Sequence, residues 1–123
     1  MSESAPPDVE TTLRGTYAAF NDRDIDAALA ALREDVDWPN MIDGTRVVGH
    51  DEVRSYWSRQ FHEIDSHVEP KRFDMDDEGH IIVDVHQVLR DRDGLLLDDR
   101  MVRHVYMISD GLIVQMDVSP YRP

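Results

Sequence analysis

Two histidines interrupt apolar, strand-like runs in the second half of the chain. His86 lies in the run Val83–Val88, and His104 lies in the run Val102–Met107. A titratable side chain on the inner face of a sheet needs a hydrogen-bond partner or a chemical task, because burial without either costs free energy. The two histidines therefore mark a candidate site for acid–base chemistry, and a structural, hydrogen-bonded role is the alternative.

Carboxylates in the same region are candidates for orienting these histidines. Asp84 precedes His86 by two residues, and Asp117 lies in the last apolar run, across a predicted turn from His104. A neighbouring carboxylate favours the imidazolium or selects one tautomer, as general acid–base catalysis requires. The candidate catalytic set is therefore His104, His86, Asp84 and Asp117. Aspartate is abundant in the chain, so a structural or interfacial role is the alternative for both carboxylates.

Aromatic, amide and thioether side chains are candidates for the wall of a pocket that binds an apolar molecule. The candidate substrate-binding residues are Tyr17, Trp38, Asn40, Trp57, Phe61, Tyr106 and Met116. The sequence contains no cysteine, no His-x-x-x-His pair, no glycine-rich phosphate loop and no Gly-x-Ser-x-Gly motif. We therefore expect neither a metal site nor a cofactor.

Composition restricts the partners and the organisation of the chain. With 123 residues, 41% of them hydrophobic, the chain is long enough for a single core, which we place at 8–123 behind a flexible polar tail at 1–7. The formal charge of −13 disfavours nucleic acid and anionic membranes, which repel it. No apolar run approaches the length of a membrane span, so we expect a cytoplasmic protein.

Hydrophobic periodicity predicts helices followed by strands. A period of 3.6 residues indicates helices over 8–21, 24–33 and 49–64. Strand patterns separated by turn residues cover 36–39, 45–48, 67–75, 80–91, 95–108 and 112–118. This order is typical of an α+β fold in which helices cover one face of an antiparallel sheet.

Several segments together resemble a known superfamily. They are the run Tyr17–Asp26, Asp35–Trp38, the Gly49–Asp51 opening of a helix, and Tyr106–Ile113. In order and spacing they resemble the nuclear transport factor 2-like superfamily, specifically its SnoaL-like branch. The resemblance implies a cone-shaped, curved antiparallel sheet packed on three N-terminal helices, with a pocket for a small apolar molecule and a homodimer formed through the outer sheet face.

Enzymes of this superfamily can be compared with the chain position by position. The helix-one tyrosine of ketosteroid isomerase falls at Thr16 or Tyr17, and its pocket carboxylic acid falls at His104. Its catalytic base falls at Asn40 or Trp38, and neither residue is a base. Scytalone dehydratase places two histidines on strands that line the pocket, for which His86 and His104 would be the counterparts.

The turn types decide whether the two histidines share a face. A three-residue loop Arg92–Gly94 sets residue 86 opposite 100 and 82 opposite 104, which places both histidines on one face. A two-residue turn reverses this result. In the last hairpin, a two-residue turn sets His104 opposite Asp117, and a three-residue loop sets it opposite Met116.

Two functions are consistent with these patterns. The first is an enzyme of isomerase, dehydratase or cyclase type, in which His104, with or without His86, moves a proton on a small apolar substrate. The alternative is a non-catalytic ligand-binding or dimeric association module, which the missing base favours.

Overall fold

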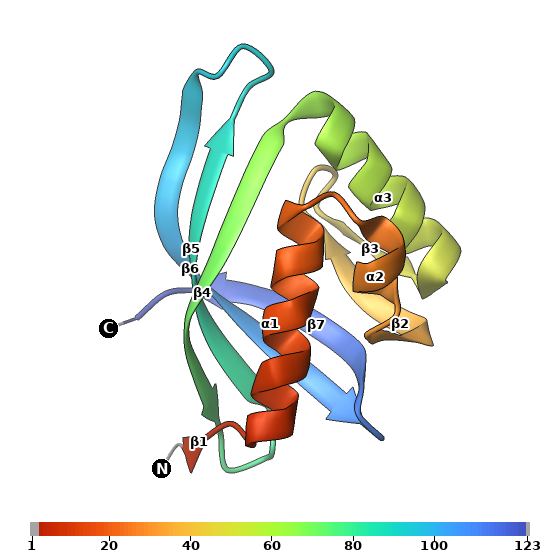
Figure 1. The fold of residues 1–123 in the computed structure, drawn as a ribbon, viewed down its shortest axis with the longest axis vertical. Coiled ribbons are helices and arrows are strands. Elements are labelled where there is room, and N and C mark those ends of the chain that lie inside the picture. Colours follow the sequence, from red (N-terminus) through yellow and green to blue (C-terminus); the bar gives the residue numbers. More distant parts are fainter. Residues whose placement is uncertain (1–2, 123) are drawn as a thin grey trace.

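Three helices lie on one face of a curved sheet in the computed structural model of the chain, which describes residues 3–122 (Figure 1). The helices are α1 (Pro7–Asn21), α2 (Ile25–Leu29) and α3 (Gly49–Glu63). The strands are β1 (Glu3–Ser4), β2 (Leu32–Asn40), β3 (Thr45–Val48), β4 (Asp65–Met75), β5 (Ile81–Arg90), β6 (Leu96–Ser109) and β7 (Leu112–Pro120). The predicted α+β fold is confirmed.

The sheet has the strand order β1-β4-β5-β6-β7-β2-β3. Its neighbouring strands are antiparallel except for β2 and β7, which run parallel. The expectation of a wholly antiparallel sheet is therefore wrong at this one pair. The parallel pairing has a packing reason, because it buries Leu32 and Ile113 side by side and lets the Ile113 N–H donate to the Ala31 carbonyl at 2.9 Å.

The second helix is shorter than its sequence pattern predicts. Asp24 is its N-cap and accepts a hydrogen bond from the Ala27 N–H at 3.1 Å, as expected of aspartate at that position. The helix then ends at Leu29 instead of Arg33, because the chain turns into β2 and Leu32 pairs with Ile113. Tertiary pairing therefore overrides the helical pattern of the last turn.

The third helix begins at a tight approach between backbone segments. Gly49 has a φ of +87°, and a Cβ atom there would lie 3.3 Å from the Glu34 carbonyl oxygen. Glycine is favoured at such a position because it has no Cβ. The Glu52 carboxylate accepts a hydrogen bond from the Val48 N–H at 2.9 Å and satisfies a donor at the helix start. None of the described helices is long and apolar enough to cross a membrane.

Part of the predicted flexible tail at 1–7 is packed on the sheet. Ser4 pairs with Asp74 in β1, and Ala5, which is only 6% exposed, donates its N–H to the Phe73 carbonyl. The prediction of a flexible tail is therefore wrong for residues 3–7. Residues 1 and 2 of that tail, and residue 123 of the predicted domain, lie outside the described residues.

The β5–β6 hairpin combines a three-residue loop with a β-bulge. The Asp91 N–H donates to the Leu95 carbonyl at 2.9 Å, so residues 92–94 form the loop. Beyond the loop, Arg90 pairs with Leu96 but Leu89 pairs with Asp98, which leaves Leu97 as an extra residue in β6. Because side chains alternate with a period of two, one extra residue exchanges the faces of everything that follows.

The bulge separates the two strand histidines. Val83 faces His104 and Met101 faces His86, instead of the pairings 82 with 104 and 86 with 100 that a bulge-free three-residue loop predicts. His104 therefore points to the helices, and His86 points to the opposite, outer face. The three-residue loop was one of the two predicted alternatives. The two histidines nevertheless lie on opposite faces, as the two-residue alternative predicts.

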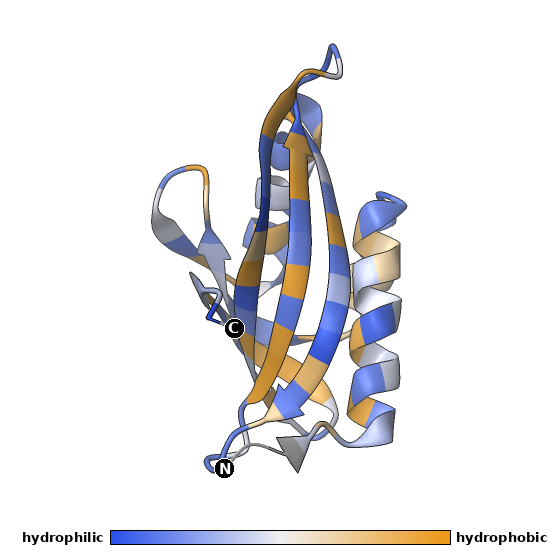
Figure 2. Ribbon diagram, turned by 90° about the vertical axis from the view of Figure 1, so that its left-hand side faces the viewer, coloured by the Kyte–Doolittle hydropathy of each residue, from blue (hydrophilic) through white to orange (hydrophobic). Residues whose placement is uncertain are grey.

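The last hairpin contains a second bulge. Ser109 pairs with Leu112 across a two-residue turn, but Met107 pairs with Gln115, which leaves Val114 as an extra residue in β7. His104 consequently faces Val118, so both predicted pairings, with Asp117 and with Met116, are wrong. Apolar and polar residues still alternate along the long strands, so the sheet keeps one inner and one outer face (Figure 2).

Candidate functional site

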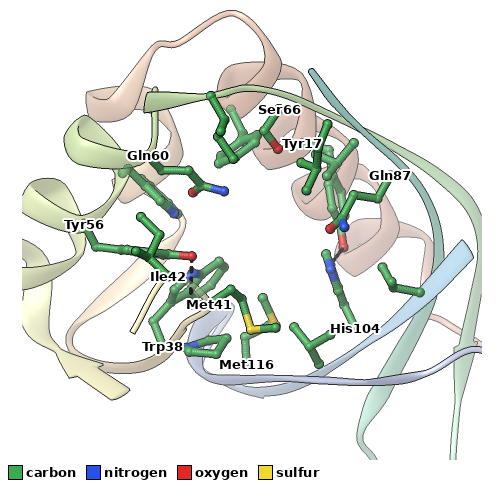
Figure 3. Close-up of a pocket in the computed structure, with 18 of the residues that line it drawn as sticks. Tyr17, Trp38, Met41, Ile42, Tyr56, Gln60, Ser66, Gln87, His104 and Met116 are labelled. Carbon is green, nitrogen blue, oxygen red and sulfur yellow. Dashed lines mark hydrogen bonds between the residues drawn. The ribbon is translucent and has the colours of Figure 1, made fainter. Parts of the chain in front are cut away.

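A cavity of about 250 Å³ lies between the inner face of the sheet and helices α1 and α3 (Figure 3). Most of its lining is apolar or aromatic and includes Phe20, Trp38, Met41, Ile42, Trp57, Ile64, Val68, Leu89, Val102, Met116 and Val118. Trp38 and Trp57 pack edge to face with their ring centroids 5.4 Å apart. Such a cavity suits a small molecule with an apolar body.

A chain of three hydrogen-bonded side chains reaches the cavity wall. The Tyr106 hydroxyl donates to the Tyr17 hydroxyl at 2.7 Å, and the Tyr17 hydroxyl lies 2.7 Å from Nδ1 of His104. The rings of Tyr17 and His104 are stacked, with centroids 5.8 Å apart and an angle of 14° between their planes. Because Tyr106 donates to Tyr17, the Tyr17 proton is available to Nδ1, which then acts as the acceptor.

This arrangement defines the protonation of His104. Burial lowers the pKa of His104 from 6.5 to about 4, so the imidazole is neutral at pH 7. With Nδ1 accepting from Tyr17, the single ring proton resides on Nε2. No described residue hydrogen-bonds to Nε2, and no fully buried polar side-chain atom of the described chain lacks a partner, so Nε2 is open to the cavity. His104 therefore presents a neutral N–H donor to a ligand.

Tyr17 and Tyr106, the two tyrosines hydrogen-bonded in series with His104, are held in their neutral form. Burial raises the pKa of Tyr17 well above its usual value, and the neighbouring Tyr106 raises it further. Burial also raises the pKa of Tyr106. The hydroxyls therefore serve as hydrogen-bond donors and not as phenolates at neutral pH.

Further polar side chains line the cavity, among them Tyr56, Gln60, Ser66 and Gln87. Tyr56 accepts a hydrogen bond from the Met41 N–H at 3.1 Å, so its own proton is free for a ligand. Gln60, Ser66 and Gln87 also line the cavity and point into it (Figure 3). Sequence reasoning missed these three residues. Gln87 is one position beyond His86, so the correct register would have identified it, whereas Gln60 and Ser66 had no distinguishing signal.

His86 and Asp84 do not belong to this cavity. Nε2 of His86 lies 2.6 Å from the Asp99 carboxylate on the outer sheet face. Asp84 accepts a hydrogen bond from Nε of Arg103 at 2.9 Å on the same face. Their predicted placement beside His104 is wrong, because the bulge at Leu97 turns them away from the helices.

Asp117 also lies on the outer face, where it forms an ion pair with Arg46 at 2.8 Å. Its predicted contact with His104 is wrong because the bulge at Val114 shifts β7 by one residue. The buried neighbour of His104 is thus Tyr17, not a carboxylate. This difference matters chemically, because a hydroxyl leaves the imidazole neutral whereas a carboxylate favours its protonation.

Two predicted substrate-binding residues have structural contacts instead. The Asn40 side chain accepts hydrogen bonds from the N–H groups of Ile42 and Asp43, both at 3.0 Å, and so stabilises the turn after β2. Phe61 packs on Phe20 with ring centroids 4.9 Å apart and does not line the cavity. The other five predicted residues lie in the cavity wall: Tyr17, Trp38, Trp57, Tyr106 and Met116. Their contact with a substrate stays a prediction.

The titratable chemistry of the cavity is limited. Among the described residues, no aspartate or glutamate lines it, and no group of three or more histidine, aspartate or glutamate side chains is placed to hold a metal ion. Arg100 lines the cavity but already pairs with Asp98 at 2.9 Å. The site can therefore bind an apolar molecule and donate hydrogen bonds to its oxygen atoms, and a strong anionic base is not among its lining residues.

Solved structures share this architecture. An NTF2-like protein of unknown function from Burkholderia pseudomallei is 26% identical, with a TM-score of 0.81, and the match covers 94% of this chain and 92% of that protein. TerC, co-crystallised with polyporic acid, is 19% identical with a TM-score of 0.79 over 93% and 92% of the two chains. An LEH-like epoxide hydrolase from M. tuberculosis is 19% identical with a TM-score of 0.74 over 90% and 80%.

Family comparison agrees with these likenesses. No curated protein matches the chain. The model of the SnoaL-like domain matches residues 13–116, which contain the second half of α1, all of α2 and α3 and most of the sheet, together with Tyr17, His104 and Tyr106. The chain therefore belongs to the SnoaL-like domain family.

Proposed function

We propose that the cavity binds a small, largely apolar molecule and that His104 donates a hydrogen bond from Nε2 to a carbonyl or hydroxyl oxygen of this molecule. The proposal is carried by one observation, the chain Tyr106–Tyr17–His104 that ends on the cavity wall. Each hydroxyl in the chain donates toward the cavity, so the chain supports donation by Nε2. TerC, a protein of the same fold, was co-crystallised with polyporic acid.

We further propose that this hydrogen bond supports isomerase-, dehydratase- or cyclase-type chemistry. A donor in a low-dielectric site stabilises negative charge that develops on a substrate oxygen, for example when a ketone becomes an enolate. Complete transfer of the Nε2 proton is unfavourable, because it leaves an imidazolate. Protonation of Nδ1 through Tyr17 and Tyr106 would in turn leave a phenolate at Tyr106, whose pKa burial raises. His104 thus acts as an electrophile, and solvent or the substrate supplies the base.

The bicyclic ketone β-tetralone provides a direct test. Exchange of its α-hydrogens in D₂O at pH 7.5, followed by proton NMR, reports enolate formation. We expect the protein to accelerate this exchange, His104→Leu to abolish the acceleration, and His104→Gln, which keeps an N–H donor, to retain part of it. Equal acceleration by His104→Leu and the wild type would refute the catalytic role of His104.

A non-catalytic binding module is the second candidate, and the lack of a carboxylate in the cavity wall favours it. The same probe separates the two candidates. If β-tetralone binds with an affinity that depends on His104 but its α-hydrogens exchange at the rate in buffer, the protein is a binding module. If β-tetralone does not bind to the wild type, both candidates fail.

We also propose a homodimer formed through the outer sheet face. This face is not covered by helices, and it carries Met107, which is 40% exposed, next to half-buried apolar side chains such as Met101 and Val105. Sedimentation velocity should give the mass of a dimer, and Met107→Glu should shift it toward a monomer. Leu95→Glu, at the exposed tip of the β5–β6 hairpin, is the matched control that should remain dimeric. A monomeric wild type would refute the proposal.

A further inference from the structure

Three polar side chains in the cavity wall lack a side-chain hydrogen-bond partner among the described residues. They are Gln60 on α3, Ser66 on β4 and Gln87 on β5, and all three point into the cavity (Figure 3). Within residues 3–122, no side-chain hydrogen bond is formed by any of them. Ser66 is nevertheless only 2% exposed, so its hydroxyl is withdrawn from bulk solvent. A polar group in this situation is stabilised by a ligand or by water inside the cavity.

Gln87 and Ser66 lie several residues away from His104 along the sheet. Gln87 is four residues along β5 from Val83, which faces His104, and this corresponds to roughly 13 Å between backbones. Ser66 pairs with Leu89 and Gln87 pairs with Val68, so Ser66 and Gln87 are diagonal neighbours, typically about 7–8 Å apart. Ser66 and Gln87 therefore form a second polar subsite, and Val102 lies in the cavity wall between His104 and Arg100, the residue opposite Gln87.

The chemistry of this subsite suits a neutral hydroxyl group. Each amide offers both a donor and an acceptor, and the serine hydroxyl does the same, which matches a group that donates and accepts at once. Arg100 lies opposite Gln87, but it is already paired with Asp98 at 2.9 Å. Asp98 offsets the charge of Arg100, so the subsite has no net positive charge that would select a carboxylate.

From this geometry we infer that the ligand is an elongated, oxygenated molecule with two polar ends. One oxygen accepts from Nε2 of His104, and a hydroxyl at the far end is held by Gln87 and Ser66, with Gln60 contributing from α3. The apolar body between them packs against the aromatic wall. This inference rests on the proposed binding of an oxygen at His104 and specifies the class of ligand.

A pair of matched probes tests the second subsite. β-Tetralone carries one oxygen, and its 6-hydroxy derivative carries a second at the opposite end of the rings. We expect the added hydroxyl to tighten binding to the wild type about three- to tenfold by calorimetry, the effect of one net hydrogen bond. Gln87→Leu and Ser66→Ala should each reduce this gain, measured as the ratio of the two probe affinities within the same variant.

The control variant is Gln115→Leu. Gln115 lies on the outer face of β7, where it donates to Asp117 at 3.0 Å, and its replacement should preserve the full gain. Equal affinity of the two probes for the wild type, or an undiminished gain in both subsite variants, would overturn the second subsite but not the His104 site. Failure of both probes to bind would refute the proposed function itself and the subsite with it.

Discussion

The buried, neutral state of His104 predicts a specific loss of stability in acid. The test compares the unfolding free energy of the wild type with that of His104→Gln. In this variant the amide oxygen can still accept a hydrogen bond from Tyr17, but the side chain does not titrate. Burial lowers the pKa of His104 in the folded protein from 6.5 to about 4. Between these two values the unfolded chain binds a proton that the folded protein does not, so stability falls as the pH falls.

The magnitude follows from the same shift. A pKa decrease from 6.5 to about 4, at about 1.4 kcal/mol for each unit, corresponds to about 3 kcal/mol of stability that is present above pH 6.5 and lost by pH 4. Other titrating groups contribute to the acid sensitivity of both proteins and cancel in the difference between them. The difference in unfolding free energy should therefore shift by about 3 kcal/mol in favour of the variant on acidification.

Urea denaturation, followed by the fluorescence of buried Trp38 and Trp57, measures this difference at intervals from pH 8.5 to pH 4.5. Between pH 8.5 and 7.5 the difference should stay constant, which provides an internal control. Parallel stability curves of the two proteins down to pH 4.5 would refute the assignment of a desolvated, neutral His104. An NMR titration of the His104 ring in the folded protein should agree, with the Nε2–H tautomer at pH 7.

Three further results are expected. Tyr17→Phe removes the hydrogen bonds of Tyr17 with Tyr106 and His104 and should lower the unfolding free energy by about 1–3 kcal/mol in urea denaturation. An unchanged unfolding free energy would contradict these two hydrogen bonds. Asp84→Leu breaks the ion pair between Asp84, whose side chain is 11% exposed, and Arg103, whose side chain is 26% exposed. It should lower the unfolding free energy by about 2 kcal/mol, while calorimetry should show unchanged β-tetralone binding. Deleting Leu97 removes the bulge without changing the pairing of His104, so circular dichroism should show a folded protein. Deleting Met101 should lower stability more, because residues 98–100 or the residues that follow Met101 must then exchange faces. Equal effects of the two deletions would contradict the register.

The elements themselves were largely predictable because they depend on local patterns. The 3.6-residue period and the Asp24 cap place the helices, and the glycines at positions 79, 94 and 111 adopt positive φ angles in turns between strands. Tyr17, Trp57 and Tyr106 also lie in the cavity wall, as their place on the apolar faces of their elements suggests. The early end of α2 was not predictable, because the strand pairing of Leu32 replaces a favourable helical turn.

The register of the strands in the last two hairpins was not predictable from the local sequence. Turn length was correctly included among the alternatives for both hairpins, yet the bulges at Leu97 and Val114 each shift a strand by one residue. A bulge has no consistent local sequence signal here, since both extra residues are ordinary apolar side chains. The shift removes His86, Asp84 and Asp117 from the neighbourhood of His104 and brings Gln87 to the cavity.

The sequence by itself determines an acidic α+β chain with His104 on an apolar strand and Tyr17 on an apolar helix face, because hydrophobic periodicity and turn residues act over a few positions. Only the tertiary structure decides that these two side chains meet at 2.7 Å, that Tyr106 extends the chain, and that no carboxylate joins them. Side-chain direction in a sheet alternates with every residue, so a single bulge far along the strand changes which groups meet. The chemistry of His104 as a neutral donor is therefore a property of the register.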